Sequence, residues 1–269
     1  MLHQKLAEMP EASWLPAIAA MVAAIGDNLF PARLTDLLRA VVPYRYTVIF
    51  AYAGDAQPID LYDDFPTGKR QIFVTDYQAG PYLLDPFFLA ATRPVPSGLY
   101  RIRDLAPDRF YQGEYFRNYY VQTGLAEEVG YFVNLPGGVT VVASLMRDDL
   151  PFTLHAFRRL QQVSPVVAAC IARHWAELDQ KFVGAGQATA RGPRIEQAFH
   201  SFGQGLLTPR ERQIAEYTLK GHSPDAMGRI LGIAPGTVRI HRRNIYAKLR
   251  IGSQGELFSR FILSLEGSD

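Results

Sequence analysis

The stretch that decides the fold is Thr237-Val238-Arg239-Ile240-His241-Arg242-Arg243-Asn244-Ile245-Tyr246-Ala247-Lys248-Leu249, near the end of a 269-residue chain. Three apolar residues recur at i, i+7 and i+11 and so share one helical face: Val238, Ile245 and Leu249. Four basic residues occupy the remaining surface: Arg239, Arg242, Arg243 and Lys248. No acidic residue lies between Asp225 and Glu256, although like charges one helical turn apart repel. A face that meets a polyanion explains this pattern better than an ordinary solvated basic face.

Three more short helices flank this stretch, each with its own start signal. Thr208-Pro209-Arg210-Glu211 combines an N-cap hydroxyl, a proline at the first helical position and a glutamate at N3, which is a capping box. Ser223-Pro224 begins the next helix, and the turn Ile233-Ala234-Pro235-Gly236 leads from it into the basic helix. Ser253-Gln254-Gly255-Glu256 begins the last one. The two middle helices form a helix-turn-helix, whose second helix enters the major groove of DNA.

These residues resemble the LuxR-type DNA-binding domain, without gaps over about residues 205 to 265. The matching segments are Leu207-Thr208-Pro209-Arg210-Glu211-Arg212, Gly221-His222-Ser223, Ile230-Leu231-Gly232-Ile233, Thr237-Val238-Arg239-Ile240-His241 and Asn244-Ile245-Tyr246-Ala247-Lys248-Leu249. The resemblance implies that Arg239, Ile240 and Arg243 face base edges, and that Thr237 and Lys248 approach phosphates. We expect two more residues at the same DNA-binding surface: Arg242 and Thr208.

The chain departs from this family at Pro224-Asp225-Ala226-Met227-Gly228, where the family shows a polar-acidic start followed by Ile-Ala. A glycine in a helix interior costs about 1 kcal/mol relative to alanine. We therefore expect Gly228 to make the first helix of the helix-turn-helix less rigid, without affecting the DNA-binding interpretation.

The charge of the chain is divided unevenly between its two parts. The net charge is +2, from 28 Lys and Arg against 26 Asp and Glu. Residues 1–180 hold 15 basic and 19 acidic residues, which gives −4, whereas residues 181–269 hold 13 and 7, which gives +6. The positive charge therefore coincides with the helix-turn-helix, as expected for a nucleic-acid-binding domain.

Composition and local patterns also indicate the cellular compartment in which the protein is expected. A length of 269 residues suits two domains, and the single cysteine, Cys170, fits a reducing cytoplasm. Cys170 lies in an apolar run, which favours a buried structural thiol. The apolar stretch Ile18–Ile25 lacks the basic lead-in of a signal peptide, and no run approaches the length of a membrane span. We expect a cytoplasmic, nucleoid-associated protein.

Alternating helical and strand patterns in residues 1–180 predict an α+β fold. Helices are expected at Trp14–Ile25, Pro31–Val42 and Thr153–Asp179, with Pro165 kinking or dividing the last. Strands are expected at Tyr46–Tyr52 and Ile59–Tyr62, and a hairpin at Gly130–Leu135 and Val139–Met146. Helices outside an antiparallel sheet make an α/β/α sandwich. The predicted organisation is a ligand-sensing and dimerisation domain (1–180), a glycine-rich linker with a short helix near Arg194–Phe199 (181–204), and an all-α four-helix DNA-binding domain (205–269).

The irregular segment between the early strands and the hairpin is rich in aromatic residues. Its rings are Phe73, Tyr77, Tyr82, Phe87, Phe88, Tyr100, Phe110, Tyr111, Tyr115, Phe116, Tyr119 and Tyr120. So many phenols suggest a cavity with an apolar body and polar tips, the usual composition of a small-molecule site. The alternative is an ordinary core together with a dimer surface.

Within this segment, Asp85-Pro86 followed by Tyr100 resembles the acyl-homoserine-lactone-binding domain of quorum-sensing regulators. That family shows Trp-x-x-x-Tyr, then Asp-Pro, then another Trp; here Phe73-x-x-x-Tyr77 stands one residue too close to Asp85, and Tyr100 replaces the second Trp. The resemblance implies that Asp85 accepts a hydrogen bond from a ligand amide and that Tyr77 donates to the acyl carbonyl. Phe73 cannot donate to a lactone carbonyl as the family's first Trp does. The expected ligand-binding residues are Phe73, Tyr77, Tyr82, Asp85, Phe88 and Tyr100.

Loss of the lactone-reading Trp favours an amine- or amide-bearing ligand over an acyl-homoserine lactone. A carboxylate near aromatic faces accepts from an amide N–H or pairs with an ammonium ion, which the rings also attract. The alternative role for Asp85 is to cap a helix beginning at Pro86, because Asp before Pro is a common helix start.

No catalytic, metal or cofactor site is indicated. The histidines His3, His155, His174 and His200 lack metal-ligand spacing, and no nucleophile elbow or phosphate-cradling loop is present. The pairs Glu127-Glu128 and Asp148-Asp149 are interpreted as solvated turns. A receiver domain is not indicated either, because regular βαβ alternation is missing.

The sequence thus predicts a one-component transcriptional regulator, not an enzyme, that binds double-stranded DNA as a homodimer under control of a small-molecule effector. Two-fold operators double the base contacts that one recognition helix offers. Ligand binding is expected to shift the population of linker arrangements. Two alternatives stay open: an acyl-homoserine-lactone receptor, and a ligand-independent DNA binder whose first domain only dimerises or receives a protein partner.

Overall fold

Five antiparallel strands form the middle layer of the N-terminal part of the chain. The computed structural model describes residues 14–54, 56–93, 95–117, 121, 124–182 and 195–266. The strands are β1 (Tyr46–Ala53), β2 (Ile59–Asp63), β3 (Gly98–Arg101), β4 (Glu127–Asn134) and β5 (Val139–Arg147). They lie in the order β2-β1-β5-β4-β3 with antiparallel neighbours throughout. The central pair, β1 and β5, stays in register from Tyr46 opposite Met146 to Ala53 opposite Val139.

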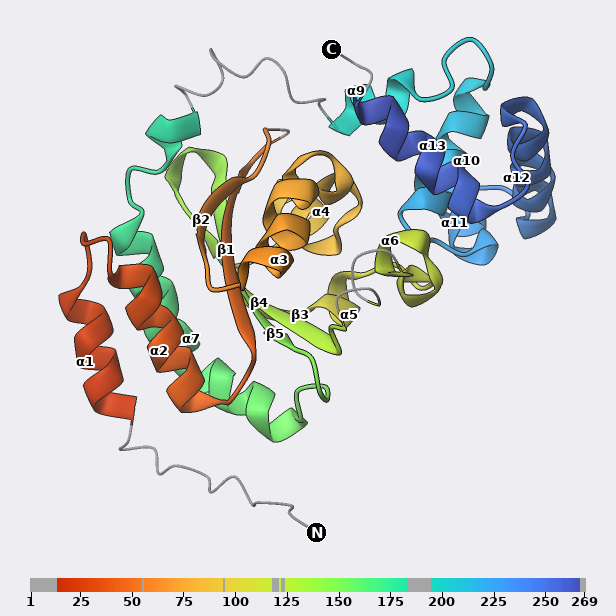
Figure 1. Cartoon of the computed structure of the whole chain (residues 1–269). Coiled ribbons are helices and arrows are strands. Elements are labelled where there is room, and N and C mark those ends of the chain that lie inside the picture. Colours follow the sequence, from red (N-terminus) through yellow and green to blue (C-terminus); the bar gives the residue numbers. More distant parts are fainter. Residues whose placement is uncertain are drawn as a thin grey trace.

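Helices cover both faces of this sheet (Figure 1). One face carries α1 (Leu15–Ala23), α2 (Phe30–Val41) and α7 (Leu154–His174). The other carries the short helices of the aromatic segment: α3 (Thr67–Arg70), η2 (Gln71–Asp76), η3 (Pro81–Leu84), α4 (Pro86–Thr92), α5 (Ile102–Leu105), η4 (Phe110–Gln112) and α6 (Glu114–Phe116). Successive side chains of β1 point to opposite faces of the sheet, so Ile49 packs in one core and Phe50 in the other. The expected α/β/α sandwich is confirmed.

Most elements of the sandwich lie where the sequence places them. β4 and β5 form the predicted hairpin through η6 (Pro136–Gly138). The helix containing Pro165 is a single element, so Pro165 does not divide it, and it ends at His174 rather than Asp179. The four-residue strand β3 has no counterpart in the prediction, because so short a strand carries almost no periodic signal.

The C-terminal domain consists of helices, as predicted: α10 (Pro209–Leu219), α11 (Pro224–Leu231), α12 (Pro235–Leu249) and α13 (Gln254–Glu266). Thr208 and Glu211 form the expected capping box at the start of α10. The helix α9 (Ile195–Ser201) falls inside the predicted linker and packs on α13, with the rings of Phe199 and Phe261 stacked 4.7 Å apart. Linker residues 183–194 lie outside the described part of the chain.

Gly228 allows a tight turn between α11 and α12. A Cβ at this position would lie only 2.8 Å from the carbonyl oxygen of Ile233. The amide of Ile233 in turn donates to the carbonyl oxygen of Gly228 at 3.0 Å. A side chain would push the turn away from the helix, so we interpret Gly228 as a packing requirement rather than a source of flexibility.

The sandwich and the C-terminal domain share one buried apolar cluster. The cluster includes Tyr82 and Phe110 from the sandwich and Leu257 and Leu265 from the C-terminal domain. The approach is close, because a Cβ at Gly80 would lie 2.6 Å from Leu265 Cδ1. Within the described residues, no helix combines the length and the hydropathy needed to span a bilayer.

Candidate nucleic-acid interface and ligand site

α12 lies at the outer edge of the C-terminal domain, away from the sheet (Figure 1). Its apolar stripe is buried as the spacing predicts: Val238, Ile245 and Leu249. Arg239 and Arg243, one turn apart, are exposed and make no hydrogen bond or ion pair with any described residue. Ile240 beside them is 52% exposed. Two arginines on an unobstructed helix face can form bidentate hydrogen bonds with guanine bases in a major groove.

Two other predicted DNA contacts are engaged within the domain itself. The Arg242 guanidinium donates to the Tyr246 hydroxyl at 3.1 Å and to Gln254 Oε1 at 3.4 Å. Lys248 Nζ pairs with Glu211 Oε2 at 2.6 Å. Their contact with DNA stays a prediction, and it requires these side chains to share or exchange their present partners.

The Glu211 carboxylate joins α10 to α12. Besides Lys248, it accepts hydrogen bonds from the backbone N–H and the hydroxyl of Thr208, at 2.8 and 2.9 Å. Burial raises the pKa of Glu211, but the hydrogen bonds from Lys248 and Thr208 outweigh burial and leave the pKa lowered. Thr208 itself is exposed, and Thr237 is half-buried in the first turn of α12.

In the sandwich, Asp85 begins α4 and is almost fully buried. Its Oδ1 accepts from the backbone N–H of Phe87 at 2.9 Å, so Asp85 caps the helix as the alternative interpretation predicted. Its Oδ2 accepts from the Tyr77 hydroxyl at 2.7 Å. No described residue forms an ion pair with this carboxylate. The cap and the aromatic cluster therefore use the same side chain.

Aromatic rings surround the Asp85 carboxylate. The Tyr77 hydroxyl lies 3.2 Å from the Tyr52 hydroxyl, which extends the hydrogen-bonded chain toward β1. The rings of Tyr82 and Phe88 meet edge to face at 4.7 Å, and Phe88 also lies 5.5 Å from Tyr52. The structure thus brings together four of the predicted ligand-binding residues: Tyr77, Tyr82, Asp85 and Phe88.

The charge on Asp85 is energetically unfavourable in this setting. Burial raises its pKa to about 6, although the hydrogen bonds from Tyr77 and Phe87 act in the opposite direction. Burial and the Asp85 charge likewise raise the pKa values of Tyr52 and Tyr77 well above the usual value for tyrosine, so both phenols stay protonated. A cation brought next to Asp85 would remove part of this penalty.

The other two predicted ligand-binding residues are placed differently. Phe73 stacks on Phe65 with centroids 4.7 Å apart and lies at the edge of the cluster. Tyr100 lies on β3, where its hydroxyl donates to the carbonyl oxygen of Pro96 at 2.9 Å and its ring meets Phe132. Tyr100 makes no direct hydrogen bond to Asp85 in the described part of the chain; the two are connected through the rings of Phe132 and Phe87.

Sequence reasoning missed Tyr52 and misread one acidic pair. Tyr52 was predicted only as a strand residue, although its alternation with Phe50 already placed both rings on one face of β1. Glu127 and Glu128 are each 5% exposed, so their interpretation as a solvated turn is wrong. They lie within β4, where Glu127 pairs with Arg101 at 3.1 Å.

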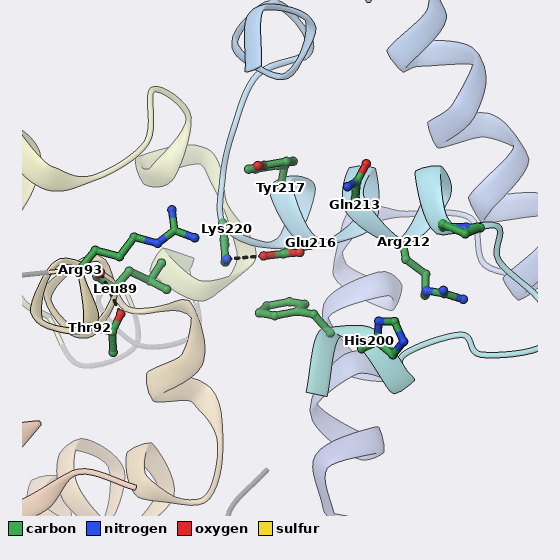
Figure 2. Close-up of a pocket in the computed structure, with 11 residues that line it drawn as sticks. Leu89, Thr92, Arg93, His200, Arg212, Gln213, Glu216, Tyr217 and Lys220 are labelled. Carbon is green, nitrogen blue, oxygen red and sulfur yellow. Dashed lines mark hydrogen bonds and ion pairs between the residues drawn. The ribbon is translucent and has the colours of Figure 1, made fainter. Parts of the chain in front are cut away.

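A cavity of about 580 Å³ separates α4 from the C-terminal domain (Figure 2). Leu89, Thr92 and Arg93 line it from the sandwich side. On the opposite wall, Lys220 pairs with Glu216 and lies over the ring of Phe199 at 4.9 Å. Figure 2 shows Arg93 extending from α4 toward Lys220. The two domains therefore face each other across a polar opening next to their shared apolar cluster.

The helix-turn-helix segment matches a known family. Residues 205–261 match the bacterial regulatory proteins of the luxR family. A protein of Aeromonas salmonicida, described as an HTH-type transcriptional regulator in the exeN 3′ region, is 36% identical over 183 residues, which are 66% of this chain and 93% of that protein. The monoamine regulon transcriptional regulator of Klebsiella aerogenes is 22% identical over 244 residues, covering 90% of this chain and 95% of the relative.

The sandwich also has a counterpart among solved structures. The VqsR LBD domain from Pseudomonas aeruginosa superposes with a TM-score of 0.53 at 23% sequence identity. The match covers 61% of this chain and 97% of that domain. At this level of identity the likeness concerns the fold.

Proposed function

The chain belongs to the LuxR family of bacterial regulatory proteins, and from this we propose that it is a one-component transcriptional regulator whose sandwich domain binds an amine- or amide-bearing small molecule. α12 enters the major groove, with Arg239, Ile240 and Arg243 directed at base edges. The regulator acts as a homodimer on a two-fold operator. Its relatives are transcriptional regulators, and we assign no catalytic role to the chain.

The observation that supports a ligand site is the Asp85 carboxylate. It is buried among Tyr52, Tyr77 and Phe88, yet no described residue supplies a positive charge to it. A buried charge without a counter-ion is costly, and such groups are often found where a ligand completes the site. An ammonium group would supply the missing charge, and the surrounding rings would add cation–π attraction.

The ligand class follows from the donors and acceptors around Asp85. A carboxylate selects N–H groups, and the Tyr77 hydroxyl already donates to it. Phe73 offers no donor for a lactone carbonyl, and Tyr100 is engaged with Pro96. The similarity to a regulator of a monoamine regulon also supports an amine. An acyl-homoserine lactone remains the second candidate, because its amide N–H would satisfy Asp85 in the same way.

A thermal-shift comparison tests the proposal directly. A phenylalkylamine, its N-acetyl amide and an acyl-homoserine lactone are added separately to the full-length protein. We expect the amine to raise the melting temperature most, because at equal concentration a ligand that binds the native state more tightly stabilises it more. Stabilisation by the lactone alone would establish the second candidate instead. No stabilisation by any of the three would count against the ligand class proposed here.

Asp85→Asn gives the corresponding variant. Asparagine can still cap α4 at Phe87, but it carries no charge for an ammonium ion. Loss of a buried, charge-paired carboxylate should weaken amine binding by more than tenfold, from about 2–5 kcal/mol. Operator binding without ligand should be unchanged. A variant that melts several degrees lower yet still responds to the amine would restrict Asp85 to its capping role.

Two tyrosine variants test whether amine binding depends on the Tyr77 hydroxyl next to Asp85 or on the Tyr100 hydroxyl on β3. Tyr77→Phe removes the hydroxyl that donates to Asp85 and should weaken amine binding. Tyr100→Phe is a matched change at a hydroxyl held by Pro96, and the geometry predicts no effect on binding. Equal losses in both variants would place Tyr100 at the ligand, as the sequence resemblance implied.

A further inference from the structure

One segment of the sandwich holds the helix-turn-helix at the beginning of α11. Asp108 Oδ1 accepts a hydrogen bond from the backbone N–H of Ser223 at 2.9 Å. The next residue, Arg109, donates its backbone N–H to the carbonyl oxygen of Gly221, also at 2.9 Å. Gly221 has φ of +89°, and a Cβ there would lie 3.0 Å from Phe110 Cα. The two backbones are therefore in direct contact.

The beginning of α11 is a position where DNA is expected. In a helix-turn-helix the second helix lies in the groove while the first helix crosses the phosphate backbone. Backbone N–H groups at the start of a helix favour an anion through their unpaired donors and the helix dipole. α11 is the first helix here, and Ser223 is its N-cap. In the structure, the anion at this N-cap is the carboxylate of Asp108.

Asp108 is an anion under ordinary conditions. Burial raises the pKa of Asp108, but the hydrogen bonds from Ser223 and the nearby His222 together outweigh it and leave the pKa lowered. The exposed basic face lies on α12, at the outer edge of the domain in Figure 1, and Arg239 and Arg243 form no hydrogen bond or ion pair with any described residue of the sandwich. A DNA phosphate approaching the N-terminus of α11 would therefore compete with Asp108, whereas Arg239 and Arg243 are exposed.

The same segment is anchored in the aromatic core. Phe110 is 2% exposed, and its ring lies 6.0 Å from Tyr115 and 5.7 Å from Phe116. Tyr115 is buried close enough to Tyr77 to influence its pKa. Asp108 is thus two residues from a ring cluster that reaches the surroundings of Asp85.

We propose that the Asp108 carboxylate takes the place of a DNA phosphate at the N-terminus of α11, and that the segment Pro107–Gly113 thereby holds the helix-turn-helix in a docked state with reduced DNA affinity. The inference uses the contact between the domains and the DNA-binding role of the family, and it holds whatever ligand the sandwich binds. Because phosphate contacts carry no sequence information, docking lowers the affinity for cognate and random DNA alike.

The test compares Asp108→Ala with Asp104→Ala in the full-length protein without ligand. Asp104 is an exposed carboxylate on α5 that is bonded to no described residue of the C-terminal domain, so this variant matches the change in net charge. Binding is measured to an operator obtained by in-vitro selection and to a random duplex. Asp108→Ala should raise both affinities by roughly three- to tenfold, the range for one lost charge-assisted contact of partial exposure. The ratio of the two affinities should stay constant.

Hydrogen exchange supplies the second measurement. The Ser223 amide should exchange faster in Asp108→Ala than in the wild type, and Asp104→Ala should leave it unchanged. Asp108→Asn keeps an acceptor oxygen but no charge, so its DNA affinity should fall between those of the wild type and the alanine variant. The proposal is overturned if Asp108→Ala gains no more affinity than Asp104→Ala, or gains affinity while the Ser223 amide stays as protected as before.

Discussion

At the scale of single residues, Asp85 joins the fold to the proposed function. The same carboxylate caps α4 through Phe87 and receives the Tyr77 hydroxyl. The sequence offered capping and ligand binding as alternative roles of Asp85, because an Asp-Pro pair supports either one. It could not show that the capping carboxylate also accepts the Tyr77 hydroxyl, or that Tyr77 in turn meets Tyr52 on a distant element.

If an ammonium ligand binds at Asp85 as proposed, the pKa of Asp85 predicts that its affinity depends on pH. An ammonium ligand requires the carboxylate to be ionised, and burial raises the pKa of Asp85 to about 6. Amine affinity should therefore be constant above about pH 7 and fall toward tenfold per pH unit below pH 6, since an alkylamine stays protonated throughout. Isothermal titration calorimetry between pH 5 and 8 measures the amine affinity. The neutral N-acetyl amide is the control, and its affinity should depend less on pH. Identical profiles for amine and amide would contradict an ion pair at Asp85.

The raised pKa of Asp85 also makes the stability of the fold depend on pH, and the stability should fall as the pH rises, whereas the amine affinity should rise. A carboxyl group with a raised pKa in the folded state stabilises the fold below its unfolded pKa, and this contribution is lost as the pH rises through about 6. The free energy of unfolding of the wild type, relative to Asp85→Asn, should therefore fall by up to about 3 kcal/mol between pH 4 and pH 7, from 1.36 kcal/mol per unit of pKa. Urea unfolding at the two pH values checks the sign. A rise instead of a fall would mean that Asp85 has a cationic partner in the ligand-free protein.

At the scale of elements, the basic residues of α12 fall into two groups with different contacts. Its arginines Arg239 and Arg243 face outward, whereas Lys248 is tied to Glu211 on α10. Arg239→Ala should cost about 1–3 kcal/mol of binding free energy on the selected operator and relax base preference at one position.

Lys248→Ala should weaken binding to operator and random DNA together. It should also lower the melting temperature, because it leaves the buried Glu211 carboxylate with fewer partners. Fluorescence anisotropy on both duplexes, with a melting curve for each variant, separates the two effects. Unchanged base preference in Arg239→Ala would remove it from the base-reading set.

Elements with strong local signals were predictable, and those defined by distant contacts were not. The capping box at Thr208 and the hairpin at Pro136–Gly138 are set by neighbouring residues, and both lie where the sequence placed them. Glu127 and Glu128 were taken for a turn because two adjacent carboxylates look solvated. Arg101, 26 positions away in the chain, pairs with Glu127 and makes its burial possible. No local sequence pattern predicts an ion-pair partner so distant in the chain.

At the scale of the whole molecule, the two domains are joined by more than the predicted linker. The apolar cluster continues from Phe110 into α13, and the backbone at Gly221 touches the sandwich. The sequence suggested separate domains because each has its own periodic pattern and charge. The contact of the Gly221 backbone with the backbone of Arg109 and Phe110 leaves no such pattern, so the docked arrangement became visible only in the structure.

The proposed control of DNA binding by the sandwich also depends on how many chains bind the operator. A single α12 offers few base contacts, so we expect the full chain to bind DNA as a homodimer, with one recognition helix per half-site. Sedimentation velocity at micromolar concentration should show a dimer, whereas residues 205–269 alone should be monomeric and bind the operator weakly. Inserting about 5 base pairs between the half-sites of the selected operator turns them to opposite sides of the duplex and should abolish tight binding, whereas about 10 base pairs should partly restore it. A monomeric full chain whose affinity ignores half-site spacing would contradict the dimer and confine the role of the sandwich to contacts within one chain.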